Sequence, residues 1–300
     1  MNFILTAVLV LGAIALSSAV ILYVCSKKFA VKEDPRLGKV VEILPGANCG
    51  GCGFPGCSGL AGALVKAADV GSIDNLNCPV GGNDVMNKVA NLLGMSITNS
   101  EARVAVVRCN GTCDLRPPVS LYDGLLTCAA MHSAGAGETL CGYGCLGCGD
   151  CASVCKFDAI KINDVTRLPE VYEDKCTGCG ACAKACPRNI IGLMKKGLKG
   201  RRVYVRCMNK DKGAIAMKSC KAACIGCGKC FNECKFGAIT VTNNLSYIDA
   251  DKCRLCRKCV SVCPTDAIIA LNFPTPSHKP VVAQNSIKRN ENPDNLSKEE

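Results

Sequence analysis

Tryptophan is absent from this chain of 300 residues, and aromatic residues make up only 4% of it. The length suffices for two or more domains. With so few aromatic side chains, a chain of this length needs something besides a large hydrophobic core to hold it together. Aromatic residues interleaved with basic ones are also missing, which speaks against nucleic-acid binding. The two histidines, His132 and His278, have no ligand-like spacing, and we interpret them as ordinary polar residues.

The motifs of common catalytic and nucleotide-binding sites are missing as well. No G-x-G-x-x-G follows a predicted strand, and there is no Walker loop, no Ser-His-Asp order and no acidic metal cage. The sequence therefore predicts no nicotinamide or flavin site and no stand-alone catalytic residue. What it has instead is 27 cysteines, most of them in C-x-x-C-x-x-C arrays. Such spacing favours metal centres strongly over disulfides.

The formal net charge is basic, 36 − 25 = +11. Such an excess is typical of chains that bind nucleic acid or an anionic membrane surface. A four-iron cubane on four thiolates, however, carries a charge of roughly −2 when oxidised, so five of them contribute about −10. We therefore interpret the lysine and arginine excess mainly as compensation for clusters.

The N-terminus contains one long apolar run. Residues 3–24 carry no charge, and Lys27 and Lys28 follow at once. The run is long enough to cross a bilayer as a helix, and the lysines place the rest of the chain on the cytoplasmic side. This predicts a single-pass protein of the inner (cytoplasmic) membrane, where thiols stay reduced. A cleaved signal peptide is disfavoured because no positive charge precedes the apolar run.

The remaining sequence contains an internal repeat. Residues 141–162 align with 220–241, and residues 176–193 align with 253–270. Ahead of the repeat, apolar spacing predicts a helix that ends at Gly94, and residues 101–109 are typical of a strand.

These patterns predict an α+β protein. It consists of a single transmembrane helix, a small Cys-rich 4Fe-4S module and two tandem bacterial-ferredoxin-like 2[4Fe-4S] domains. The predicted segments are an anchor at 1–25, a linker at 26–44 in which Pro35 breaks any long helix, the N-terminal 4Fe-4S module at 45–98, a connecting Cys-containing segment at 99–140, the two ferredoxin-like domains at 141–200 and 201–272, and a disordered tail at 273–300.

Four cysteine arrays have the form C-x₂-C-x₂-C-x₃-C, which is the bacterial ferredoxin run. In that run the fourth cysteine ligates the other cluster of a pair, so ligands are shared crosswise. Zinc is disfavoured, because zinc sites usually separate two Cys pairs by a dozen or more residues. The four predicted ligand sets are Cys145, Cys148, Cys151 and Cys186; Cys176, Cys179, Cys182 and Cys155; Cys224, Cys227, Cys230 and Cys263; and Cys253, Cys256, Cys259 and Cys234.

A fifth set lies just after the apolar run. Cys49, Cys52 and Cys57 are separated by two and four residues, and Cys78 follows after twenty more. Four thiols with glycine-rich turns fit another four-iron cluster, because glycine lets the loop approach the cubane closely. The spacing is not that of a ferredoxin, so we expect a separate small module close to the bilayer.

Six further cysteines remain besides Cys25. Cys109, Cys113, Cys128 and Cys141 could hold a sixth cluster, and free buried thiols are the alternative. Cys207 and Cys220 precede the second repeat as Cys109 and Cys141 precede the first. The sequence therefore predicts five [4Fe-4S] clusters, or six if this extra site exists.

At two positions the arrays depart from the usual pattern. Proline follows the fourth cysteine as Pro187 and Pro264, but Lys156 and Lys235 take that place in the other two arrays. We interpret these lysines either as solvated surface residues or as charges that stabilise a reduced cluster or attract an acidic donor protein.

The motif "NCGGCGFPGC…C" after one N-terminal helix, followed by ferredoxin arrays, resembles the B subunit of the Rnf (Rsx) electron transport complex. The stretches "RCNGTC", "GYGCLGCGDC", "NKDKGAIAMKSC" and "NNLSYIDADKC" resemble the long form of that subunit, and the resemblance covers about residues 1–272. It implies an anchored subunit of an ion-translocating ferredoxin:NAD⁺ oxidoreductase. Such a subunit accepts electrons from soluble reduced ferredoxin and relays them to flavin- and NAD-bearing membrane subunits.

Three other functions are weighed against this one. The tandem arrays alone would fit a polyferredoxin subunit of another membrane redox complex, but the N-terminal module argues against that. The same chain of clusters would also serve as the reductant of a redox-sensing regulator. An activator of corrinoid proteins rests only on similar Gly- and Cys-rich modules and is the weakest of the three.

Overall fold

The computed structural model describes residues 2–28, 34–71, 73, 76–96, 101–135 and 137–274. The chain divides into two compact units, one of residues 1–101 with 177–181 and the other of residues 102–176 with 182–300. The tail predicted at 273–300 lies outside the described residues from residue 275 onward.

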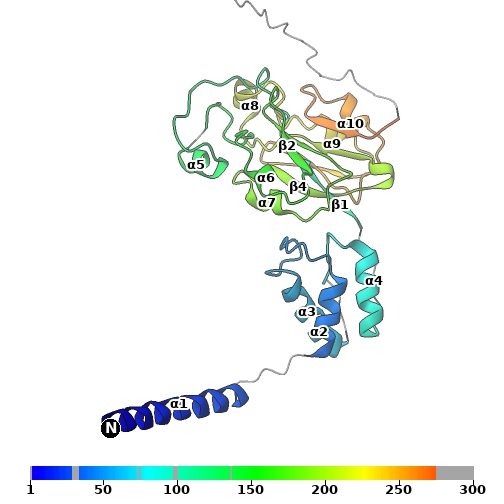
Figure 1. The fold of residues 1–300 in the computed structure, drawn as a ribbon. Coiled ribbons are helices and arrows are strands. Elements are labelled where there is room, and N and C mark those ends of the chain that lie inside the picture. The colour runs from blue at the N-terminus through cyan, green and yellow to red at the C-terminus, as the bar shows by residue number, and fades with distance from the viewer. Residues whose placement is uncertain are drawn as a thin grey trace, which may run out of the picture. The chain divides into compact units, whose positions relative to one another are not determined.

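The apolar run at the N-terminus is helical, as predicted. Helix α1 (Asn2–Lys28) carries Lys27 and Lys28 in its last turn, where a positive charge complements the helix dipole (Figure 1). From Phe3 to Lys28 its side chains are exposed. Among the described residues it is the helix that is long and apolar enough to cross a membrane, by length and composition.

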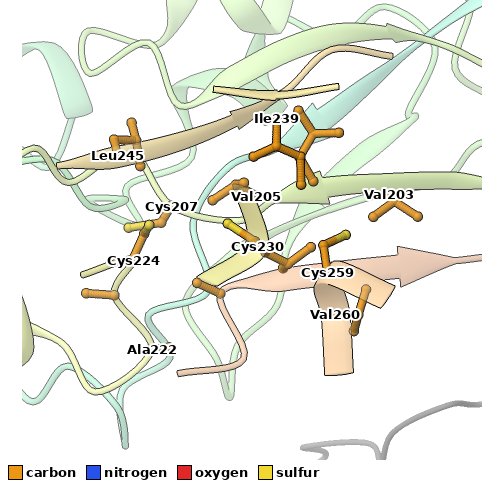
Figure 2. Close-up of a cluster of buried hydrophobic side chains, with 14 of the residues drawn as sticks. Val203, Val205, Cys207, Ala222, Cys224, Cys230, Ile239, Leu245, Cys259 and Val260 are labelled. Atoms are coloured by element: carbon orange, nitrogen blue, oxygen red, sulfur yellow. The ribbon is translucent and has the colours of Figure 1, made fainter. Parts of the chain in front are cut away.

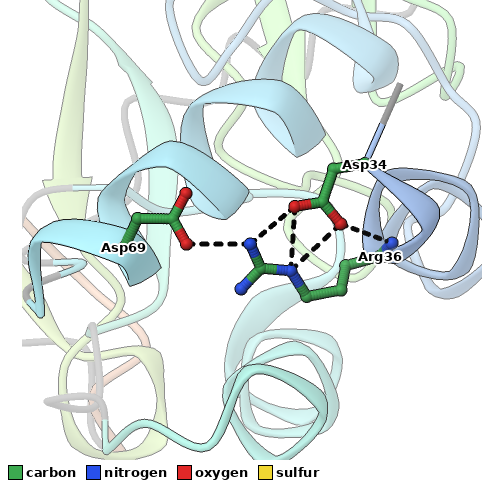
Figure 3. A network of polar contacts seen from close by, with 3 residues as sticks. All are labelled: Asp34, Arg36 and Asp69. Atoms are coloured by element: carbon green, nitrogen blue, oxygen red, sulfur yellow. Dashed lines mark hydrogen bonds and ion pairs between the residues drawn. The ribbon is translucent and has the colours of Figure 1, made fainter. Parts of the chain in front are cut away.

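Three helices follow α1 in the first unit: α2 (Pro35–Ile43), α3 (Cys57–Val70) and α4 (Gly82–Leu93). Helix α2 lies within the segment predicted to be a linker. Pro35 begins this helix rather than breaking one, because the first helical position needs no N–H donor. The Asp34 side chain caps the helix by accepting the N–H of Arg36 (Figure 3).

The helices of the first unit share a small apolar core. Val40 of α2, Leu60 and Leu64 of α3 and Val89 of α4 are almost completely buried in it. At the surface, the Arg36 guanidinium reaches Asp34 at 2.5 Å and Asp69 at 2.8 Å, which links the start of α2 to the end of α3 (Figure 3). Helix α4 ends, as predicted, at Gly94, whose left-handed φ of +70° suits glycine.

The second unit contains the same strand arrangement twice. In the first half (residues 102–176 and 182–200), β1 (Arg103–Val107) pairs antiparallel with β4 (Ile191–Lys195), and β2 (Ile160–Ile162) pairs with β3 (Pro169–Val171). In the second half (residues 201–274), β5 (Arg202–Val205) pairs with β8 (Ile268–Leu271), and β6 (Ile239–Thr242) pairs with β7 (Leu245–Ile248). In each half the strand before the arrays pairs with the strand after them, which confirms the α+β class.

The pairing of β1 places residues 103–107 in the first ferredoxin-like fold. The sequence repeat begins that domain only at residue 141, because β1 lies well before the cysteines that define the repeat. Val104 faces Met194 across the pair and Val107 faces Ile191. Four of the five β1 residues are buried, so the strand is part of the core and not of a connecting segment.

The other helices are short. Four of them hold the third cysteine of an array, and glycine with a positive φ directly precedes three of these, as Gly149 before α6, Gly180 before α7 and Gly228 before α9. The short elements are α5 (Cys128–Ser133), α6 (Asp150–Ser153), α7 (Ala181–Ala185), the 3₁₀ helix η1 (Leu198–Gly200), α8 (Gly213–Ser219), α9 (Lys229–Glu233) and α10 (Lys258–Ser261).

Cysteines make up much of the core in both halves. In the second half, Val203 and Val205 of β5 lie with Ile239 beside Cys230 and Cys259 (Figure 2). The first half packs its strands around buried Cys145, Cys151 and Cys182. Thiols therefore stand among the Val, Leu and Ile side chains of both cores.

Candidate metal centres

The N-terminal centre begins in the loop before α3. The Asn48 side-chain oxygen accepts the backbone N–H of Cys57 at 2.7 Å, which closes the loop onto the first residue of α3. A Cβ added to Gly56 would lie 2.9 Å from this oxygen, and φ at Gly56 is +124°, so glycine is required there. The helix N-terminus at Cys57 favours a thiolate.

Cys78 returns to this loop from beyond α3. It is buried, and the N–H of Gly81 donates to its sulfur at 3.3 Å. Burial raises the pKa of the Cys78 thiol, and the nearby thiols of Cys57 and Cys52 add to the shift. The structure thus brings Cys52, Cys57 and Cys78 together, with Cys49 in the same loop.

In the first half, three cysteines predicted to share a cluster line one cavity. They are Cys145 and Cys151 of the first array and Cys186 of the second, and Cys128 also lines this cavity. Burial raises the pKa of Cys151 to about 12, and Cys128, Cys182 and Cys186 add to the shift.

Cys148, the remaining member of this predicted set, does not line the cavity and lies beside Cys128 and Met131 of helix α5. The Met131 sulfur of α5 is 4.0 Å from the Cys148 sulfur. The Asp150 carboxylate accepts the N–H of Cys128 at 2.8 Å and that of Ala129 at 3.1 Å, and so holds the start of α5. Burial, followed by the neighbouring Cys128, raises the pKa of Cys148 to about 11.

The neighbouring centre of the first half draws on both arrays. Cys155 accepts the N–H of Ala159 at 3.4 Å, and Cys176 accepts that of Ala105 at 3.5 Å. Both pack against the core that contains Cys182. Backbone N–H groups that point at sulfur are typical of iron–sulfur ligands, whose reduction potential they help to set.

In the second half, one cavity is lined by Cys224, Cys227, Cys230 and Cys263. The hydroxyl oxygen of Ser246, on β7, lies 3.3 Å from the Cys230 sulfur and 3.7 Å from the Cys224 sulfur. Cysteine spacing gave no sign of this serine, because it belongs to the hairpin between the arrays.

The fourth array makes the matching group. Cys259 is buried, and burial raises its pKa to about 12. The neighbouring thiols add to the shift, in the order Cys253, Cys256, Cys230 and Cys234. Both groupings of the second half combine three cysteines of one array with the last cysteine of the other, which is what crosswise sharing requires. The ligand assignments themselves stay a prediction.

The described residues contain no group of three or more His, Cys, Asp or Glu side chains arranged for a single metal ion. A cubane is larger than one ion and takes one thiolate at each of four iron corners, so its ligands stand farther apart. The chemistry of all five sets, with four soft thiols in each, fits that group.

The extra cysteines are not gathered as one group of Cys109, Cys113, Cys128 and Cys141. Cys113 is exposed, with its sulfur 3.8 Å from the Thr166 carbonyl oxygen, and Cys128 lines the cavity beside Cys145. Cys109 and Cys141 instead line a separate cavity with two thiols of the second half, Cys207 and Cys220.

Two models of known protein families match parts of the chain. A model described as "4Fe-4S dicluster domain" matches residues 144–190 and 223–267, which are the two pairs of arrays. A second model, described as "Putative Fe-S cluster", matches residues 44–70 and so includes the first three cysteines of the N-terminal set.

Three curated relatives align with most of the chain. The B subunit of the Na⁺-translocating ferredoxin:NAD⁺ oxidoreductase complex of Acetobacterium woodii is 46% identical over 268 residues, covering 89% of this chain and 78% of the relative. The B subunit of an ion-translocating oxidoreductase complex of Methanosarcina acetivorans is 38% identical over 89% of this chain and 98% of its own length. The B subunit of the proton-translocating ferredoxin:NAD⁺ oxidoreductase complex of Clostridium ljungdahlii is 38% identical, with coverage of 90% and 94%.

Proposed function

The chain belongs to the family of B subunits of the ion-translocating oxidoreductase (Rnf) complexes, and on that premise we propose that it is the iron–sulfur electron-transfer subunit of a ferredoxin:NAD⁺ oxidoreductase of this kind. The observation that carries the proposal is the 46% identity over 89% of the chain to a subunit of such a complex. Five cysteine sets with cluster chemistry lie within the aligned length.

The five predicted ligand sets each hold one [4Fe-4S] cluster, a group that gains and loses single electrons. The chain's own residues supply three things to such a group. Thiols bind it, backbone N–H groups and the Ser246 hydroxyl point at its sulfur ligands, and apolar neighbours such as Ile162 and Ile190 keep water away. Crosswise ligands bring the two clusters of each half close together, which suits transfer from one to the next.

The chain is anchored by α1 as a single-pass protein of the inner membrane, with its cysteine-rich part on the cytoplasmic side. The apolar helix and the lysines at its end support this orientation. The N-terminal centre follows α1 by about twenty residues, so it would serve the membrane partners. Other subunits of the complex, including those that bear flavin and NAD, are the acceptors.

Soluble reduced ferredoxin is the proposed donor, and the second half of the second unit is where it would bind. Cys227 and Cys256, the second cysteines of the two arrays there, are exposed. Exposed Lys229 and Lys258 are two residues from them, and such charges steer an acidic donor toward the site. An electron that arrives there needs to cross little protein.

The order of transfer can be tested with Cys57→Ser in the anchored, full-length subunit within its complex. Reduced ferredoxin should still bleach the cluster absorbance of the two ferredoxin-like halves, but NAD⁺ reduction should be lost. The exposed Cys113→Ser serves as the matched control and should retain both. NAD⁺ reduction that survives in Cys57→Ser would show that electrons do not leave through the N-terminal centre.

A further inference from the structure

One cavity of the second unit is lined by four thiols that none of the five ligand sets uses. They are Cys109 and Cys141 from the first half and Cys207 and Cys220 from the second. Each is only 5–8% exposed. Free cysteines are often buried one at a time, whereas these four converge on one cavity from distant parts of the sequence.

The four thiols occupy equivalent places in the two halves. Cys109 lies two residues after β1, and Cys207 lies two residues after β5. Cys141 and Cys220 each lie four residues before the first cysteine of the array that follows. Each half therefore contributes the same pair, and the two pairs meet in one cavity. Packing of a single half would require only its own pair.

The sulfurs of this cavity receive N–H groups, as those of the ferredoxin arrays do. Cys109 accepts the backbone N–H of Cys145 at 3.4 Å, and Cys207 accepts that of Asn209 at 3.4 Å. The Asn209 side chain, 1% exposed, lies 3.6 Å from the Cys141 sulfur. Such donors stabilise sulfur that carries negative charge, which a ligated thiolate does and a free thiol does not.

The cavity also contains positive charge. Arg108, Arg116 and Arg206 line it. Arg116 is 7% exposed, and its Nε is a buried donor with no hydrogen-bond partner in the described structure. Gly111 packs closely against both groups, since a Cβ added to it would lie 3.1 Å from the Arg116 Nε and 3.2 Å from the Cys220 sulfur. The other nitrogens of Arg116 donate to the Thr139 hydroxyl at 3.1 Å and to the Cys145 carbonyl oxygen at 2.7 Å, both of which are neutral acceptors. A buried guanidinium favours a negative partner, which four neutral thiols do not supply.

We propose that Cys109, Cys141, Cys207 and Cys220 bind a further [4Fe-4S] cluster that is shared by the two halves. Four thiolates on an oxidised cubane bring a charge of roughly −2 into the cavity beside the arginines. The inference rests on the proposed function, since it assumes that the chain carries cubanes.

This position suits transfer between the two halves. The cavity touches the first array through the Cys145 N–H, and Met208 beside Cys207 packs against the apolar cores of both halves. Without a centre here, an electron would have to pass from one pair of clusters to the other without a group between them.

Iron, zinc and acid-labile sulfide per chain in full-length protein purified without oxygen test the proposal. Six clusters require about 24 iron atoms and five require about 20. Cys207→Ser should lower the iron count by about four per chain, and the remaining acid-labile sulfide should still equal the remaining iron. Cys113→Ser is the control. It removes a thiol that lies outside the cavity and belongs to the set predicted from the sequence, Cys109, Cys113, Cys128 and Cys141, so the iron count should stay at about 24.

About 20 iron atoms in the unaltered protein, one equivalent of zinc beside them, or a loss of four in Cys113→Ser would each overturn the proposal and leave the proposed function standing. Protein with no iron would overturn both. If Cys207→Ser does not fold, the other two proteins still decide. If the unaltered protein and Cys113→Ser both hold about 24 iron atoms, the buried cavity must supply at least three of the four ligands of the sixth cluster. Besides the cavity, the five sets and Cys113, the chain has only Cys25, which lies in α1, and Cys128.

Discussion

The two halves of the second unit share strand order and cysteine spacing but differ in what covers their clusters. In the first half, α5 lies over Cys148 and is held by Asp150. In the second half, the equivalent cysteine, Cys227, is exposed, and Lys229 stands where the first half has Asp150. The same fold therefore presents one covered array and one exposed array, and under the proposed function the exposed one receives the electron of the soluble donor.

The largest effect should come from removing a ligand of the exposed cluster, the one predicted to be bound by Cys224, Cys227, Cys230 and Cys263. Cys227→Ser should lower ferredoxin-driven reduction of the whole subunit by at least about tenfold, since it removes one of the two exposed entry clusters and separates the donor from the other's partner. Dithionite should still reduce the remaining clusters. In the matched variant Cys148→Ser, ferredoxin should still bleach the second half rapidly. Equal rates in Cys227→Ser and the unaltered protein, followed by stopped-flow absorbance, would remove the distinction between the halves.

Local sequence patterns predicted the elements well where one segment decides the outcome. The helix that ends at Gly94 and the strand around residues 103–107 are present, because apolar spacing and a glycine cap act locally. The pairing of β1 with β4 was missed, since 83 residues separate Val107 from Ile191 and no periodicity records that contact. No described helix runs through Pro35, in keeping with the prediction, but the short helix that begins at Pro35 was not predicted, because proline is tolerated at the first helical position.

The cysteine sets show the same limit. Spacing predicts the groups within an array, and knowledge of the ferredoxin run predicts the crosswise ligands. The meeting of Cys109 and Cys141 with Cys207 and Cys220 depends on how one half packs on the other. Only their equivalent positions before each repeat pointed to it. Asn209 and Ser246, which contact the sulfurs, have no sequence pattern at all.

The second-largest effect concerns the joint between the halves. Arg202 of β5 forms an ion pair with Glu173 of the first half, and the Arg202 side chain is 3% exposed. Glu173→Gln should lower the free energy of unfolding by about 2 kcal/mol, because it leaves a buried cation without its partner. The control is the surface pair of Lys195 and Asp251, where Asp251→Asn should cost less than about 0.5 kcal/mol. Denaturant unfolding of the holoprotein measures both, and equal losses would contradict the account.

A smaller effect is expected from Lys229 and Lys258, the positive charges beside the exposed cysteines of the second half. Reversing them in Lys229→Glu with Lys258→Glu should weaken ferredoxin binding about tenfold at low salt and less at high salt, since the attraction is screened. Lys161→Glu, at the exposed position of β2 in the first half, is the control and should change binding little. Titration at two salt concentrations gives the answer. If the control weakens binding as much, the donor does not prefer the second half.

The smallest effect should follow from loosening the cover of the shielded cluster. Asp150→Ala removes the acceptor of two N–H groups at the start of α5 and should destabilise that helix by about 1 kcal/mol. Hydrogen exchange of the amides in residues 128–133 should then be about fivefold faster. Asp164→Ala, an exposed carboxylate in the same half, should leave those amides unchanged. Unchanged exchange in Asp150→Ala would mean that α5 is held by other contacts.

The central claim is that electrons pass through the clusters of this chain on their way from ferredoxin to NAD⁺. Rapid mixing of the purified complex with reduced ferredoxin and NAD⁺, while cluster absorbance and NADH are both followed, tests it most directly. Cluster bleaching should come first, and NADH should appear only as the absorbance recovers. NADH that forms at the full rate while the cluster absorbance of this subunit stays unchanged would contradict the claim.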